Sequence, residues 1–101
     1  MSTAELFSAL GDDTRLAVLA RLDEGPISIA GLTQGQAMSR QAVTKHLHVL
    51  ERAGLVRQAR AGRETLWSLQ RQRLDEARQY LDRMSRRWDE RLDRLKALIE
   101  E

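Results

Sequence analysis

The sequence has no cysteine, a single proline and few aromatic residues. The lack of cysteine excludes a disulfide framework and a thiolate metal site. No apolar run approaches the roughly 20 residues that cross a bilayer as a helix. The first residues, from Met1 to Phe7, also lack the basic start of a secretory signal. We therefore expect a cytoplasmic protein with no membrane partner.

Apolar residues recur at helical spacing in the first half of the chain and predict helices between clear breakers. These helices are expected over residues 4–10, from Asp12 to the breaker at Pro26, over 28–34 and over 39–53. Asp12, Ser28 and Ser39 are the expected N-caps, because such side chains accept hydrogen bonds from free amides of the first turn. Gly54 follows where a left-handed residue commonly ends a helix.

The pattern after Gly54 changes to that of short strands. Residues 55–59 and 65–69 flank the glycine-containing turn 60–64, which predicts a β-hairpin with Trp67 facing the core. One long helix is expected from Leu74 onward. This order indicates a winged helix-turn-helix, a mainly α fold with a small β-hairpin wing. We expect one domain over residues 1–101, with the winged core in 1–73 and a C-terminal dimerisation helix in 74–101.

Positive charge is concentrated in the middle of the chain. The net charge is −3 over residues 1–26, +4 over 27–69 and +1 over 70–101. A basic surface favours a polyanionic partner. The helix after Ser39 has a polar outer face, and the wing is basic. The expected DNA contacts are Ser39, Arg40, Gln41, Thr44, Lys45 and His48 on the helix, and Arg60 and Arg63 on the wing.

The chemistry of these side chains suits DNA. Arginine can bind guanine through two hydrogen bonds, and glutamine can do so with adenine. Amides at the Ser39 end of the helix point toward a phosphate. Arg60 and Arg63 are placed to reach the minor groove or the backbone. The same residues could instead form ordinary solvated faces of a helix and a hairpin.

Three segments, 9–15 (ALGDDTR), 39–47 (SRQAVTKHL) and 50–56 (LERAGLV), resemble signatures of the ArsR family of bacterial repressors. Gly62-Arg63 and Trp67-Ser68-Leu69 are similar to the wing of that family. The resemblance covers about residues 4–72 and implies a winged-helix repressor. The chain departs from the family pattern at three positions that affect the first helical turn and the turn geometry: Asp13, Gln36 and Ala37.

The tail resembles a metal-independent branch of this family, whose members are often autorepressors. Metal-sensing members use a cysteine pair, or Asp, His and Glu ligands on the terminal helix. This chain has no cysteine and no histidine after His48. His46 and His48 lie two residues apart on a helix and point in different directions. We therefore expect no metal site and no cofactor.

The C-terminal helix is expected to form a dimer seam. Its apolar residues recur every three or four positions, close to a heptad. A domain this small cannot cover so long a stripe alone. The expected dimer contacts are Leu6, Phe7, Leu81, Met84, Trp88, Leu92 and Leu95. Three alternatives stay open: a helix folded back on its own domain, a seam around Leu6, Phe7 and Leu10, and an effector pocket lined by Phe7, Tyr80, Met84 and Trp88.

The leading hypothesis is a homodimeric repressor that binds a palindromic operator in double-stranded DNA. The alternatives are a winged-helix module that binds proteins and a non-specific architectural DNA-binding protein. No catalytic triad, phosphate-binding loop or supported carboxylate pair is present in the sequence, so we do not expect an enzyme. The operator, the regulated gene, any small-molecule effector and the choice between repression and activation stay open.

Overall fold

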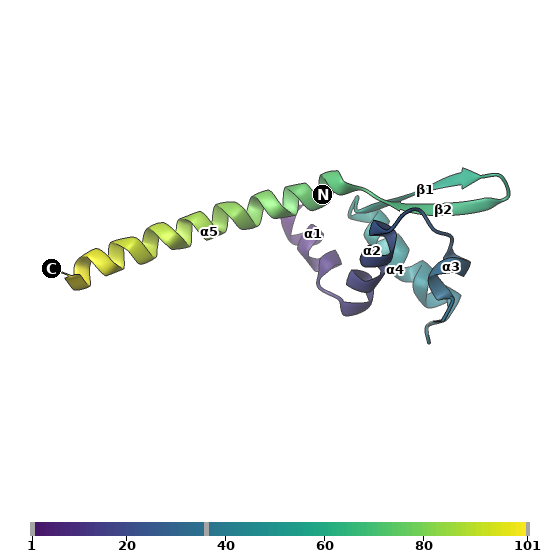
Figure 1. Cartoon of the computed structure of the whole chain (residues 1–101), viewed down its shortest axis with the longest axis horizontal. Helices are drawn as coiled ribbons and strands as arrows, with labels where there is room; N and C mark the ends of the chain where they lie inside the picture. Colours follow the sequence, from purple (N-terminus) through teal and green to yellow (C-terminus); the bar gives the residue numbers. More distant parts are fainter. Residues whose placement is uncertain (1, 36, 101) are drawn as a thin grey trace.

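The computed structural model describes residues 2–35 and 37–100 and confirms a mainly helical fold with a hairpin wing (Figure 1). The elements in chain order are α1 (Thr3–Leu10), α2 (Asp13–Asp23), α3 (Ile29–Thr33), α4 (Arg40–Arg52), β1 (Val56–Ala61), β2 (Glu64–Leu69) and α5 (Arg71–Glu100). The predicted effect of Gln36 on the turn lies outside the described residues. None of the helices that the structure describes has both the length and the apolar character to span a bilayer.

The predicted N-caps are confirmed. Asp12, Ser28 and Ser39 each accept a hydrogen bond from the backbone N–H three residues later, at 3.0–3.1 Å. Each cap satisfies an amide that the first helical turn leaves free. Gly54 has a φ of +74°, so it ends α4 in the left-handed conformation that glycine adopts most easily. Local side-chain chemistry therefore fixes where the helices begin and end.

The wing has a tighter turn than the sequence predicted. β1 and β2 pair in antiparallel register from Val56 opposite Leu69 to Ala61 opposite Glu64. Only Gly62 and Arg63 connect them, in place of the expected five-residue turn. Gly62 has a φ of +64°, and a glycine at the first central position permits a two-residue hairpin turn of type II′. The strands therefore extend further toward the tip.

The core lies between the helices and the base of the wing. Leu47, Leu50 and Leu55 are fully buried, and Trp67 is in the core as predicted. The connection between α2 and α3 joins this core through Ile27. Its N–H donates to the Trp67 carbonyl at 3.1 Å, and its carbonyl accepts from the Trp67 N–H at 2.9 Å. These hydrogen bonds attach the wing to the helical body.

The long helix α5 extends away from the core, so the alternative in which it folds back on its own domain is wrong (Figure 1). Of its described side chains, only Ala77 is buried. The chain measures 69 × 26 × 22 Å with a radius of gyration of 18.4 Å. A compact chain of about 100 residues has a radius near 13 Å. The helix also begins at Arg71, three residues before the expected start.

The Asp12 cap generates a prediction about pH. The hydrogen bond from the Arg15 N–H, assisted by the charges of Arg15 and His46, lowers the pKa of Asp12 below 3.8. Because the folded state favours the carboxylate, its stabilising effect is fully present above the ordinary pKa of an aspartate and is lost as the pH falls through the lowered value. We expect Asp12→Asn, which keeps the cap oxygen but does not titrate, to lose less stability than the native protein between about pH 7 and about pH 3. Urea unfolding measures both losses, and equal losses would contradict this role.

Candidate nucleic-acid interface

Helix α4 presents a polar face to solvent because its opposite face is in the core. Val43, Leu47 and Leu50 are buried, as the periodicity predicted. Arg40, Gln41 and Lys45 are exposed, as is the N-cap Ser39. Their short sequence separation places them near the N-terminal end of the helix, which is the end that recognition helices direct toward bases. These residues are therefore accessible to a partner, and their contacts with DNA stay predictions.

The two remaining helix residues have partners within the protein. The Thr44 hydroxyl donates to the Arg40 carbonyl at 2.7 Å, so its proton is used inside the helix. The exposed His48 has Nδ1 3.5 Å from Glu51 Oε1, and its ring lies 6.0 Å from that of Trp67. A neighbouring carboxylate reduces the attraction of His48 for a phosphate. The predicted DNA contacts of Thr44 and His48 remain predictions.

The wing and α4 both border one surface hollow, called the notch below, which the sequence alone did not reveal. Arg40 at the start of α4 and Arg63 at the hairpin tip line the same hollow of about 350 Å³. The other lining residues are Ser28, Ile29, Ala30, Glu64 and Thr65. Two guanidinium groups against the single carboxylate of Glu64 give this opening a net positive charge, which favours an anion. Arg60 is also exposed on the wing but does not line the notch.

Contacts of Arg15 and His46 hold α4 against α1 and α2. Arg15 on α2 donates through Nε to the Ala9 carbonyl at 2.7 Å and through Nη2 to the Ser8 carbonyl at 3.1 Å. Its Nη1 lies 3.5 Å from Nδ1 of His46, whose ring is also 3.9 Å from the Asp12 carboxylate. His46 is half-buried and helps join α4 to α1 and α2. The sequence contained no local signal for this pairing.

The predicted dimer residues fall into three groups. Leu6 is 2% exposed and belongs to the chain's own core, so its expected place in a seam is corrected. Helix α1 packs against α2, α4 and α5, and periodicity alone could not say which neighbour covers Leu6. Phe7 is half-buried, with its ring centroid 5.6 Å from that of Tyr80 on α5. The residues on α5 are all exposed: Leu81, Met84, Trp88, Leu92 and Leu95.

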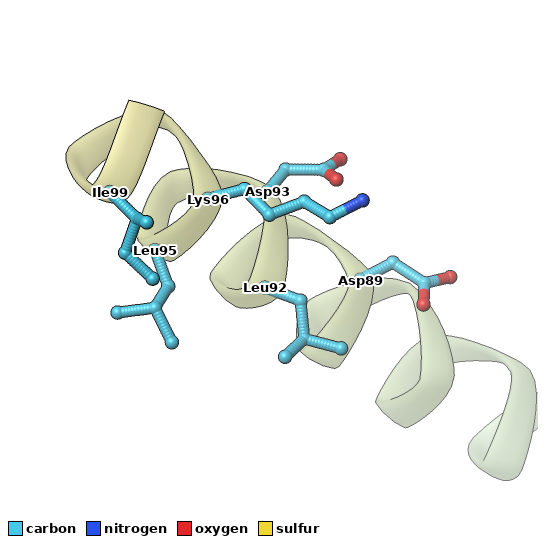
Figure 2. A pocket seen from close by; sticks show the side chains of 6 residues that line it. All are labelled: Asp89, Leu92, Asp93, Leu95, Lys96 and Ile99. Carbon is cyan, nitrogen blue, oxygen red and sulfur yellow. The ribbon is translucent and has the colours of Figure 1, made fainter. Parts of the chain in front are cut away.

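The far end of α5 has an apolar side. Figure 2 shows Leu92, Leu95 and Ile99 on one side of the helix, whereas Asp89, Asp93 and Lys96 point elsewhere. All six residues line a hollow of about 560 Å³, and all come from this single helix. A hollow with walls from one helix is an open surface, which a second element would have to cover to form an enclosed site.

Known proteins resemble this chain over the same elements. A family defined by a helix-turn-helix domain matches residues 10–59. The HTH-type transcriptional regulator Rv2034 of Mycobacterium tuberculosis is 39% identical over 77 residues, which cover 76% of this chain and 72% of that protein. The transcriptional repressor SmtB homolog of Synechocystis is 35% identical over 66 residues, which cover 65% of this chain and 50% of the relative. This chain thus aligns with only half the length of that second protein.

A solved structure extends the similarity to α5. An ArsR-like transcriptional regulator from Rhodococcus superposes with a TM-score of 0.85 at 35% sequence identity. The alignment covers 94% of this chain and 90% of that one. It therefore includes the wing and most of the long helix, as well as the matched helix-turn-helix segment.

The side-chain chemistry generates a prediction about metals. In residues 2–35 and 37–100 there is no cluster of three or more His, Cys, Asp or Glu side chains positioned to hold a metal ion. We expect zinc, cadmium, arsenite or a chelator to change DNA affinity by less than about twofold, which is below about half a kcal/mol. Gel-shift titrations in each condition measure this, with Mg²⁺ as the control ion. A large, reversible loss with any of the four would reveal a metal-responsive site.

Proposed function

Because the chain belongs to the ArsR family of helix-turn-helix transcriptional regulators, we propose that it is a homodimeric repressor that binds a palindromic operator in double-stranded DNA. The name of the Synechocystis relative, a transcriptional repressor, supports repression. We assign the protein to the cytoplasm, where its DNA is accessible, and we assign it no catalytic activity.

Arg40 and Arg63 line one notch, and the proposed DNA-binding surface rests on this observation. A module that binds proteins does not require guanidinium groups from the helix and the wing to meet. Gln41 and Lys45 are exposed on the same helix. We propose that Arg40 and Gln41 contact base edges, and that Ser39, Lys45, Arg60 and Arg63 contact phosphates or the adjacent minor groove.

The exposed stripe of α5 supports a dimer. Trp88 is 55% exposed, and it lies between Met84 and Leu92 on the same face. Monomeric soluble proteins rarely leave so continuous an apolar face in water. Pairing with a second copy would cover it and would present two recognition helices to successive turns of the DNA, about 34–36 Å apart. Because Phe7 packs on Tyr80, α1 would contribute only near the base of this seam.

The recognition face should divide by role. We expect Arg40→Ala and Gln41→Ala each to weaken operator binding by about 1–3 kcal/mol, with little effect on unrelated DNA, if they contact bases. Lys45→Ala and Arg63→Ala should weaken binding to all DNA and reduce its salt dependence, since phosphate contacts release counterions. Gel shifts on a genomic fragment selected by the native protein, with and without competitor DNA, separate the two effects.

Gln79→Ala is the matched control, because Gln79 is exposed on α5, far from the recognition face. Normal operator binding by a double variant at Arg40 and Gln41 would place base recognition on another element. A native protein that bound all DNA equally would support the architectural alternative. A native protein that bound no DNA would support the protein-binding module.

The dimer is tested at Trp88. We expect Trp88→Glu to give a folded monomer, because a buried seam cannot accommodate an unpaired carboxylate. Its operator affinity should fall by more than about tenfold, or about 1.4 kcal/mol. Sedimentation velocity measures the first effect and a gel shift the second. Gln79→Glu adds the same charge nine residues away, on the opposite face of the helix, and should stay dimeric. A Trp88→Glu dimer with normal binding would place the seam elsewhere.

A further inference from the structure

The direction of α5 depends on contacts of its first turns, where Leu74 and Ala77 pack on the core. Beyond Ala77 its large apolar side chains are exposed, apart from the contact of Tyr80 with Phe7. The base is held first by the backbone, where the Gln70 N–H donates to the Leu55 carbonyl at 2.8 Å. An ion pair of 2.9 Å between Arg71 and Asp23 adds a contact to α2. These two polar contacts attach the helix to the body but do not reach α4.

Arg73 makes the connection to the recognition helix. Its Nε donates at 3.0 Å to the carbonyl of Ala53, the C-cap of α4. Its Nη1 pairs with Glu76, one turn further along α5. The alkyl part of Arg73 packs over Gly54, where an added Cβ would lie 3.1 Å from Arg73 Cγ. Among the described residues, this is the side-chain hydrogen bond that joins α5 to the end of α4.

Burying an arginine over Gly54 has an unfavourable free-energy term. Its Nη2 is shielded from solvent and has no hydrogen-bond partner among the described residues. An unpaired buried donor is unfavourable, and an apolar side chain of similar volume would avoid that cost. The guanidinium does provide a directed hydrogen bond and a positive charge at the negative end of the α4 dipole. These are properties that fix an orientation.

We propose that Arg73 is a positioning residue that sets the angle between the recognition helix α4 and the dimer helix α5. In the dimer this angle determines how far apart the two recognition helices lie. The inference rests on the proposed dimer. Trp88 is 15 residues along α5 from Arg73, or about 22 Å at 1.5 Å per residue. A tilt of about 10° would therefore move the seam by about 4 Å, more than the 3.4 Å between base pairs.

The absence of cysteine allows a direct test. Gln41→Cys places a single thiol per subunit at the exposed start of α4. A nitroxide on that thiol reports the distance between the two recognition helices by double electron–electron resonance. We expect one narrow distance distribution for the labelled protein with Arg73. Arg73→Met keeps the alkyl part of the side chain and removes the donor and the charge. Adding it should shift the mean distance by about 4 Å or more, or should about double the width of the distance distribution.

Two further variants separate positioning from simple packing. Arg73→Lys restores the charge and a donor group but not the planar guanidinium, so its distribution should lie between those of the native residue and Arg73→Met. Arg78→Met removes an exposed guanidinium from the same helix and should leave the distance unchanged. Sedimentation must show a dimer in every sample whose distance is interpreted.

The outcomes distinguish this inference from the proposed function. A dimer whose distance distribution is the same with Arg73 intact and after Arg73→Met would overturn the positioning role alone. A labelled protein that is monomeric with Arg73 intact would overturn the dimer and this inference together. If Arg73→Met does not fold, Glu76→Ala decides, because it frees Nη1 from its partner without removing the guanidinium. Broadening in Glu76→Ala supports the role, and an unchanged distribution overturns it.

Discussion

Burial of one face of α4 is the constraint on which the rest of the structure depends. Leu47 and Leu50 are completely buried, and they lie between the other helices and the base of the wing. A helix fixed by that face has no freedom to turn its polar side inward. Arg40, Gln41 and Lys45 are therefore held toward solvent by the same packing that stabilises the domain. The stability of the domain and the exposure of this polar face therefore depend on the same contacts.

Features governed by neighbours in the chain could be predicted from the sequence. The caps at Asp12, Ser28 and Ser39 need only a side chain and an amide three residues later, so their chemistry is visible locally. Periodicity likewise identified the buried face of α4. The wing was less accurate, because a short turn at Gly62 depends on strand pairing that extends to the tip. Local pattern identified that glycine but not the length of the turn.

Features that join distant segments could not be predicted in this way. Arg15 and His46 are 31 residues apart, and Arg73 and Ala53 are 20 apart. The notch likewise depends on how the wing is placed against α3 and α4. Leu6 shows the same limit from another side: its spacing indicates burial but not what buries it. Periodicity predicts that a face is covered, whereas only the assembled fold determines by what.

The apolar stripe on α5 belongs partly to the chain's own core and partly to the exposed surface. Ala77 is 5% exposed against the chain's own core, and Leu81, one turn later, is 52% exposed. The same row of side chains thus begins as part of the domain and continues past its edge. A second subunit that covered the outer part would extend this core across a two-fold axis, with no separate interface to build. In such an assembly, a change in the tilt of α5 at its base would displace the two DNA-binding surfaces relative to each other. A rigid base would therefore be as important to recognition as the side chains that we propose to contact the bases.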